Sequence, residues 1–220
     1  MGLKSGLLGL FALAAISGTA HANLVNNGSF ETGDLTGWTY NNFTGTTPGI
    51  GITVLTTGGI NTTGYGDNVP NNDGTHAAFF VDDMAEQTLS QSLNLDAGQY
   101  SLSFALYATA SGAKNAFSFY FYSSLGAISV ALLNNSSSTT DVPVGTWTVY
   151  SYLIDISSQG SYDLFFEFTS GPTPSKDVLL DNVDLSAVPL PPGLLLLGTG
   201  VAGIGYMGRR RARRRAIRAG

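Results

Sequence analysis

Hydrophobic and polar residues alternate in short runs through the middle of this chain. Apolar or aromatic side chains recur at every second position in four such runs: 100–106, 117–122, 147–154 and 162–168. A period of two, with many aromatic and β-branched residues, is typical of β-strands. Clusters of Gly, Asn, Ser and Pro separate the runs, as at 96–98 and 171–174, and predict turns.

The rest of the chain between residues 23 and 187 agrees with this pattern, because it shows no long stripe of the 3.6-residue helical period. Ile50, Ile52 and Val54 predict one more strand, and residues 82–90 predict a short helical turn or a connecting loop. Residues 56–75, rich in Asn, Gly and Thr, predict a long irregular loop. Several short strands separated by turns predict an all-β fold of two packed sheets.

Both ends of the chain differ from this middle part. At the start, Lys4, an apolar run over 7–16 and the sequence Ala20-His21-Ala22 predict a secretory signal peptide over residues 1–22, removed by signal peptidase. Near the other end, residues 193–207 are apolar and uncharged. As a helix they would cover roughly 22 Å, less than the ~30 Å hydrocarbon core, which predicts a marginal or transient transmembrane helix.

The apolar segment lies between a proline motif and a basic tail. The tail contains Arg209, Arg210, Arg211, Arg213, Arg214 and Arg215, which should stay on the cytoplasmic side and act as a stop-transfer signal. The motif before the segment reads Val188-Pro189-Leu190-Pro191-Pro192. This three-part order resembles the PEP-CTERM sorting signals of Gram-negative bacteria, and among them the variant whose motif reads Val-Pro-Leu-Pro-Ala. Pro192 departs from that variant.

The resemblance implies how the protein would be exported. In that family an exosortase, an integral-membrane processing enzyme, recognises the motif, here Val188, Pro189, Leu190 and Pro191. The chain would pass through an inner-membrane intermediate, anchored by its C-terminal helix, and then reach the cell envelope or the exterior. An unprocessed C-terminal anchor is the alternative.

Separating the ends from the body changes the charge. The whole chain has a formal net charge of −5, but the body carries all 15 acidic residues and only Lys114 and Lys176, a formal charge of −13. Such a body does not bind nucleic acid or anionic lipid by charge. It suits calcium, neutral sugars or a high-salt exterior, although solubility alone would also explain it. With no cysteine, the body depends on core burial rather than disulfides, and its length suits one domain, residues 23–187.

The two edges of the body carry a second resemblance. Residues 23–31, followed by Gly37-Trp38, resemble the opening strand of galactose-binding-like jelly rolls, which include family 4/9-type carbohydrate-binding modules. Residues 179–186 resemble their closing strand. The resemblance implies a jelly-roll β-sandwich. Some members hold a structural Ca²⁺ where the first and last strands meet, and Glu31 and Asp181 occupy the matching places. The alternative is that both carboxylates only accept hydrogen bonds from turn N–H groups.

A sugar site needs aromatic faces beside polar groups. The candidates are tyrosines expected on the outer faces of their strands, where a hydroxyl can stay hydrated: Tyr107, Tyr120, Tyr122, Tyr150 and Tyr152. Ordinary outer-face residues are the alternative. We expect Trp38 and Trp147 to pack in the core.

Catalysis has little support in the sequence. It has no cysteine, His76 is the only histidine outside the signal peptide, and nucleophile-elbow, phosphate-loop and zinc motifs are absent. We therefore predict that the protein is not an enzyme. The leading hypothesis is a non-catalytic envelope or extracellular-matrix protein that binds exopolysaccharide. The alternatives are a structural surface protein without a sugar site and a small hydrolase.

Overall fold

The computed structural model describes residues 22–43, 51–64, 66–81, 86–109, 116–123, 126–128, 142–169 and 177–189. Residues 1–21 of the predicted signal peptide (1–22) lie outside this part of the chain, as do Leu190, Pro191, the predicted transmembrane helix and the arginine tail. Within the described ranges, no helix has the length and apolar character needed to cross a membrane.

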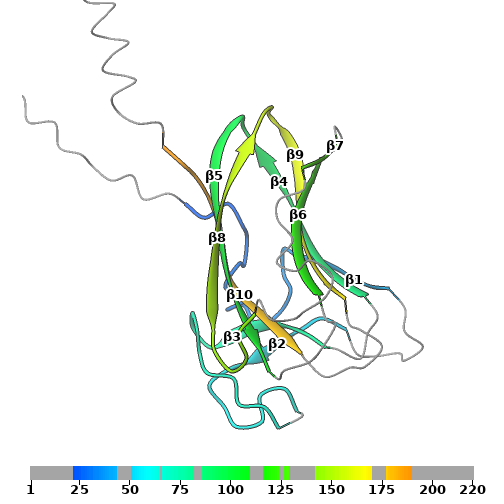
Figure 1. Cartoon of the computed structure of the whole chain (residues 1–220), viewed down its shortest axis with the longest axis vertical. Coiled ribbons are helices and arrows are strands. Elements are labelled where there is room, and N and C mark those ends of the chain that lie inside the picture. The colour runs from blue at the N-terminus through cyan, green and yellow to red at the C-terminus, as the bar shows by residue number, and fades with distance from the viewer. Residues whose placement is uncertain are drawn as a thin grey trace, which may run out of the picture.

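The described residues form two antiparallel sheets (Figure 1). The first sheet has the order β1 (Thr39–Phe43), β4 (Glu86–Leu95), β9 (Gly160–Thr169), β6 (Ala116–Ser123) and β7 (Gly126–Ile128). The second sheet has the order β2 (Thr53–Thr56), β3 (His76–Phe80), β10 (Val178–Ala187), β5 (Gly98–Ala108) and β8 (Thr148–Ile156). The predicted all-β fold of two sheets is confirmed.

The alternating runs of the sequence supply the core between the sheets. In β9 the buried side chains are Tyr162, Leu164, Phe166 and Phe168, and the residues between them are only partly buried. Phe104 of β5 in the second sheet meets Phe166 of β9 edge to face, with ring centroids 5.1 Å apart. Each large apolar side chain buried in this way contributes about 1.5–3 kcal/mol to folding. The contact ties the two sheets together.

One predicted loop is a strand instead. Residues 86–95 form β4, the second strand of the first sheet, where we expected a helical turn or connection over 82–90. The sequence of β4 lacks a clear apolar alternation, because two of its inward positions hold glutamines, Gln87 and Gln91. Gln91 is accommodated by a pair of hydrogen bonds: its Oε1 accepts from Asn26 N at 2.7 Å and its Nε2 donates to Asn26 O at 2.9 Å.

The predicted opening strand is also wrong. Residues 22–38 form turns without a strand, and Asn27 and Phe30 have positive φ angles of 51° and 57° that interrupt an extended backbone. The segment nevertheless lies beside β10, because Leu24 N donates to Leu185 O and Val183 N donates to Gly28 O, both at 2.8 Å. A Cβ on Gly28 would lie 2.0 Å from Val183 O, so this close approach requires glycine.

The long loop predicted over 56–75 is present in the described residues 57–64 and 66–75, which contain no strand. It packs against the second sheet. Tyr107 Oη of β5 donates to Asn68 O at 3.2 Å, and Trp147 Nε1 donates to Pro70 O at 2.7 Å. Beneath the loop lies a small separate hydrophobic cluster that contains Val69, Ala77, Phe79, Val81, Tyr107 and Leu179.

Candidate functional site

The outer face of the first sheet carries an ordered pattern of side chains. Strand register aligns one row across four strands, Thr39–Ser90–Phe165–Tyr120. A second row, Asn41–Thr88–Glu167–Ser118, lies next to it. These positions alternate with the buried core residues of the same strands and therefore point away from the second sheet.

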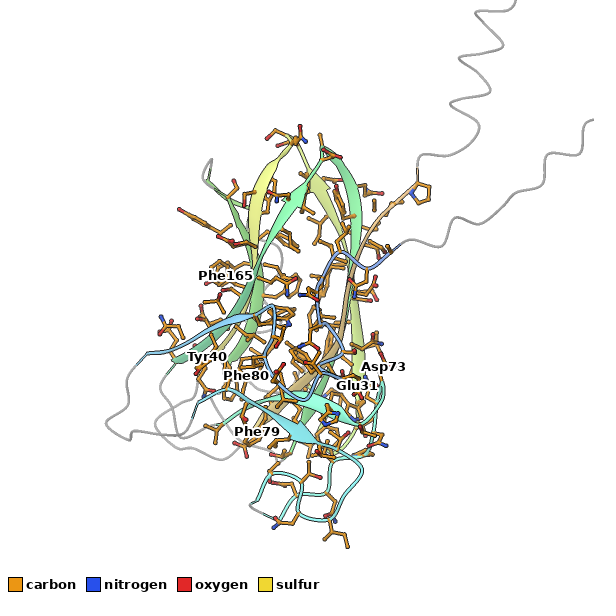
Figure 2. All side chains as sticks on the ribbon, turned by 180° about the vertical axis from the view of Figure 1, so that it is seen from behind. Glu31, Tyr40, Asp73, Phe79, Phe80 and Phe165 are labelled. Atoms are coloured by element: carbon orange, nitrogen blue, oxygen red, sulfur yellow. The ribbon has the colours of Figure 1, made fainter. Side chains whose placement is uncertain are left out.

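Two aromatic rings form the floor of a hollow on this face. The rings of Tyr120 and Phe165 stack with centroids 4.9 Å apart and an interplanar angle of 14°. The hollow, about 300 Å³ in volume and here called the outer hollow, is lined by Thr39, Tyr40, Asn41, Glu86, Thr88, Ser90, Tyr120 and Phe165. Figure 2 labels Phe165 and Tyr40 on the side of the molecule opposite Glu31 and Asp73. An aromatic floor thus lies among hydroxyl, amide and carboxylate groups.

Tyr120 stays a neutral hydrogen-bonding group in this setting. Its hydroxyl donates to Glu167 Oε2 at 3.3 Å. Burial, together with the negative charges of Glu167 and Glu86, raises the pKa of Tyr120 to about 12. The described residues contain no Lys or Arg, since Lys114 and Lys176 lie outside them. Among the described residues, the charged groups at the outer hollow are Glu86 in its lining and Glu167 beside the Tyr120 hydroxyl.

The predicted sugar-binding tyrosines do not gather at one place. Tyr120 and Tyr122 lie two positions apart on the outer side of β6, and Tyr122 is 48% exposed. Tyr107 is on the other sheet and buried under the long loop, where its ring contacts Trp147 at 5.4 Å. Burial and then the charge of Asp67 raise the pKa of Tyr107. Only Tyr120 of the five lines the outer hollow.

Tyr150 and Tyr152 lie on the inner side of β8, contrary to the expectation of outer-face positions. Their rings stack on the core residue Phe104 at centroid distances of 5.8 and 6.2 Å. The outward positions are Val149 and Leu153, each 64% exposed. Both sides of this strand carry apolar or aromatic residues. The pattern therefore predicts a strand correctly but does not indicate which side faces the core.

The tryptophans behave as packing residues. Trp38 is 8% exposed and stacks on Phe30 at 5.7 Å, which confirms its predicted core position. Trp147 is partly buried against the cluster under the long loop. Neither lines the outer hollow.

Sequence reasoning missed most of the outer hollow. Phe165, Tyr40, Asn41 and Glu86 were not proposed as site residues. Phe165 could have been found, because it occupies an outward position in the alternation of 162–168 and yet is aromatic. Tyr40 and Asn41 come from β1, which pairs with β4, and Glu86 comes from β4, which pairs with β9; the sequence reveals neither pairing.

Glu31 and Asp181, the predicted calcium ligands, both bind the segment 72–76 that leads into β3. Glu31 Oε1 accepts from Thr75 N at 2.8 Å and from His76 N at 2.7 Å. Burial acts to raise the pKa of Glu31, but the hydrogen bonds from His76 and Thr75 outweigh it and the pKa is lowered. His76 Nδ1 also lies 3.4 Å from Glu31 Oε2.

Asp181 is the more deeply buried of the two, at 1% exposure. Its Oδ2 accepts from Asn72 Nδ2 and Asp73 N, both at 3.1 Å, and its Oδ1 accepts from Asn182 N at 2.6 Å. Burial raises the pKa of Asp181 to about 6 in spite of these donors. The N-terminal segment and the last strand thereby hold the same turn through two carboxylates.

These residues fit a calcium ion in part. Carboxylate oxygens are suitable ligands, and a buried carboxylate with a raised pKa is a group that a cation would stabilise. Each carboxylate, however, already accepts N–H hydrogen bonds, as in the alternative considered from the sequence. Among the described residues, no three His, Cys, Asp or Glu side chains group as metal ligands would.

Solved structures with similar folds place this body among β-sandwich domains that include carbohydrate-binding modules. TmCBM61, solved in complex with beta-1,4-galactotriose, matches with a TM-score of 0.54 and 16% identity, covering 76% of this chain and 99% of that one. The K3 cleaved adhesin domain of Lys-gingipain from Porphyromonas gingivalis w83 matches with a TM-score of 0.51 and 17% identity, covering 76% and 99%. At these identities the likeness concerns the fold alone.

The sequence itself defines the family. The model of the HpiC1-like family, described as HpiC1 cyclase, matches residues 17–186, and the chain belongs to that family. No curated protein sequence matches the chain.

Proposed function

We propose that the body is a non-catalytic carbohydrate-binding domain, and that the outer hollow of the first sheet binds a polysaccharide. The stacked pair Tyr120–Phe165 carries this proposal. Aromatic side chains bring a large apolar surface with a polar tip, which suits a ligand whose rings have apolar faces and polar edges. Asn41, Thr88 and Glu86 line the same hollow and offer groups that hydrogen-bond sugar hydroxyls.

The fold supports the same proposal from another side. TmCBM61, a galactotriose-binding module by its description, has a similar fold over 76% of this chain. We take exopolysaccharide as the ligand class because the protein is expected to leave the cell. The alternative, a structural surface protein, would treat Tyr120 and Phe165 as ordinary outer-face residues.

Binding to soluble oligosaccharides tests the proposal. Neutral galactan, xylan and glucan oligomers would be titrated into the purified protein by calorimetry. We expect Phe165→Ala and Tyr120→Ala each to weaken binding about tenfold, equivalent to roughly 1.4 kcal/mol. Leu153→Ala, on the exposed side of β8 in the second sheet, is the matched control and should leave affinity unchanged. Equal binding by all four proteins would place the site elsewhere, and absence of any binding would favour a structural role.

We further propose that the protein is exported and sorted through its C-terminal signal, with signal peptidase and an exosortase as processing partners. The motif begins directly after β10, which ends at Ala187, and Val188 N donates to Gln99 O at 2.7 Å. The intact mass of the protein recovered from its host tests this. A mass from Asn23 to a point near Val188 is expected, whereas a mass that retains the arginines would make the tail a permanent anchor.

Structural calcium between Glu31 and Asp181 remains part of the proposal, with the buried carboxylate of Asp181 as its support. Thermal unfolding in calcium and in EDTA is the test. A calcium-dependent rise in Tm that Glu31→Gln removes is expected. An unchanged Tm would leave the hydrogen bonds to segment 72–76 as the sole role of these carboxylates.

A second candidate function is catalysis of a cyclase type, favoured by the name of the family model. The Tyr120 hydroxyl and Glu167 carboxylate, 3.3 Å apart, are groups that could move a proton. Turnover that Glu167→Gln abolishes would establish this function. Binding without turnover supports the non-catalytic proposal.

A further inference from the structure

If the outer hollow binds a polysaccharide, as proposed above, the charge around it favours some polysaccharides over others. Glu86 lines the hollow, and Glu167 contacts the hydroxyl of Tyr120 in its floor. Asp163 lies on the same outer face, one outward position further along β9, where it accepts a hydrogen bond from Ser92 Oγ. Three carboxylates thus share the face that presents the aromatic floor.

Nothing among the described residues neutralises these carboxylates with a permanent positive charge. Lys114 and Lys176 lie outside the described part, and His76, the histidine within it, pairs with Glu31 at the start of β3 in the second sheet. The negative charges act on the floor of the hollow, because both Glu167 and Glu86 contribute to the raised pKa of Tyr120. A polysaccharide of uronic acids would meet like charge here, which disfavours binding.

A ligand with an ammonium group would instead be attracted by these carboxylates. Carboxylates form charge-assisted hydrogen bonds with ammonium groups that are stronger than neutral ones. The faces of Tyr120 and Phe165 attract cations through their ring quadrupoles. A neutral sugar uses the stacking surface but gains nothing from the net charge of the rim.

From this charge complementarity we infer that the outer hollow is selective for polysaccharides that carry free amino groups, such as polymers of unacetylated 2-amino sugars. The aromatic floor accepts the sugar ring, Glu86 accepts hydrogen bonds from its ammonium group, and Glu167 adds a negative charge beside the Tyr120 hydroxyl. The carboxylates act here as determinants of specificity, while Tyr120 and Phe165 supply the surface common to all sugars.

A matched pair of ligands tests the inference. Glucosamine oligomers and N-acetylglucosamine oligomers of equal length share the ring but differ in charge. We expect the purified protein to bind the amine form at least about tenfold more tightly at low ionic strength, with the difference shrinking as salt is added. Glu86→Gln and Glu167→Gln should reduce this preference, because each removes one negative charge and keeps a hydrogen-bonding side chain of the same size.

Asp155→Asn provides the control, because it removes the same charge from β8 in the second sheet, where Asp155 is exposed and accepts from Gln99 Nε2 at 3.0 Å. Its preference should equal that of the wild type. Circular dichroism of each variant verifies folding.

The possible outcomes distinguish amino-group selectivity from carbohydrate binding in general. Equal affinity for both oligomers, or an equal loss in Asp155→Asn and the glutamate variants, would overturn amino-group selectivity while leaving carbohydrate binding intact. Failure to bind these and all neutral oligomers would instead overturn the proposed function, and the inference with it.

Discussion

The outer faces of the two sheets differ in how they are covered. On the second sheet, the long loop of residues 57–64 and 66–75 packs on Tyr107 and Trp147 and encloses its own hydrophobic cluster. On the first sheet, an aromatic pair, Tyr120 and Phe165, forms the floor of the outer hollow, which among the described residues is lined by side chains of β1, β4, β6 and β9 alone. The comparison teaches that outward aromatic residues in one sandwich can serve packing on one side and ligand contact on the other, depending on what lies above them.

Truncating the covered cluster should have the largest effect. Leu179, on β10, is fully buried beneath the long loop. Leu179→Ala creates a cavity and should lower the free energy of unfolding by about 2–5 kcal/mol. Phe165→Ala, on the open face, should lower it by much less while it weakens ligand binding. Urea denaturation of both variants makes the comparison, and equal losses of stability would mean that the two faces are equally structural.

The buried carboxylate beside β3 predicts a pH dependence. Because the folded-state pKa of Asp181 is raised to about 6, its ionised form is disfavoured in the folded state. Stability should therefore fall as the pH rises from the ordinary carboxyl pKa toward 6, by an amount on the order of 1.4 kcal/mol per pH unit at most. Asp181→Asn should flatten this slope in urea denaturation measured across pH 4–7. A wild-type slope unchanged by the substitution would contradict the assignment.

Removing the hydroxyl from the covered face should have the smallest effect. Tyr107→Phe deletes only the hydrogen bond to Asn68 O and should lower the free energy of unfolding by about 0.5–1.5 kcal/mol. Oligosaccharide affinity should stay at the wild-type value, as measured by calorimetry. A loss of affinity would show that the covered face takes part in binding, and would break the comparison.

The sequence predicted those parts of the molecule in which one face of a strand is clearly apolar. The alternation in 100–106 and 162–168 falls within β5 and β9, whose inward residues form the core. It failed where buried polar residues replaced apolar ones, as with Gln87 and Gln91 of β4. It also failed for residues 23–31, where turns bring the chain beside β10 without forming a strand.

The candidate site was harder to predict because it is made by strand order. Tyr120 was selected as an outer-face tyrosine, but its partner Phe165 comes from β9 and the rim residues Asn41 and Glu86 from β1 and β4. These strands are distant in the sequence, and their neighbours in the sheet follow from long-range pairing rather than from local pattern. Tyr150 and Tyr152 were predicted to face outward, but their rings pack on Phe104 in the core.

The most direct measurement of the central claim is a map of the ligand contact by amide chemical shifts during oligosaccharide titration of the isotopically labelled protein. The account predicts that the shifts cluster on the outer hollow, at Thr88, Ser90, Tyr120 and Phe165, and leave β8 unchanged. Shifts clustered on β5 and β8 of the second sheet would contradict it.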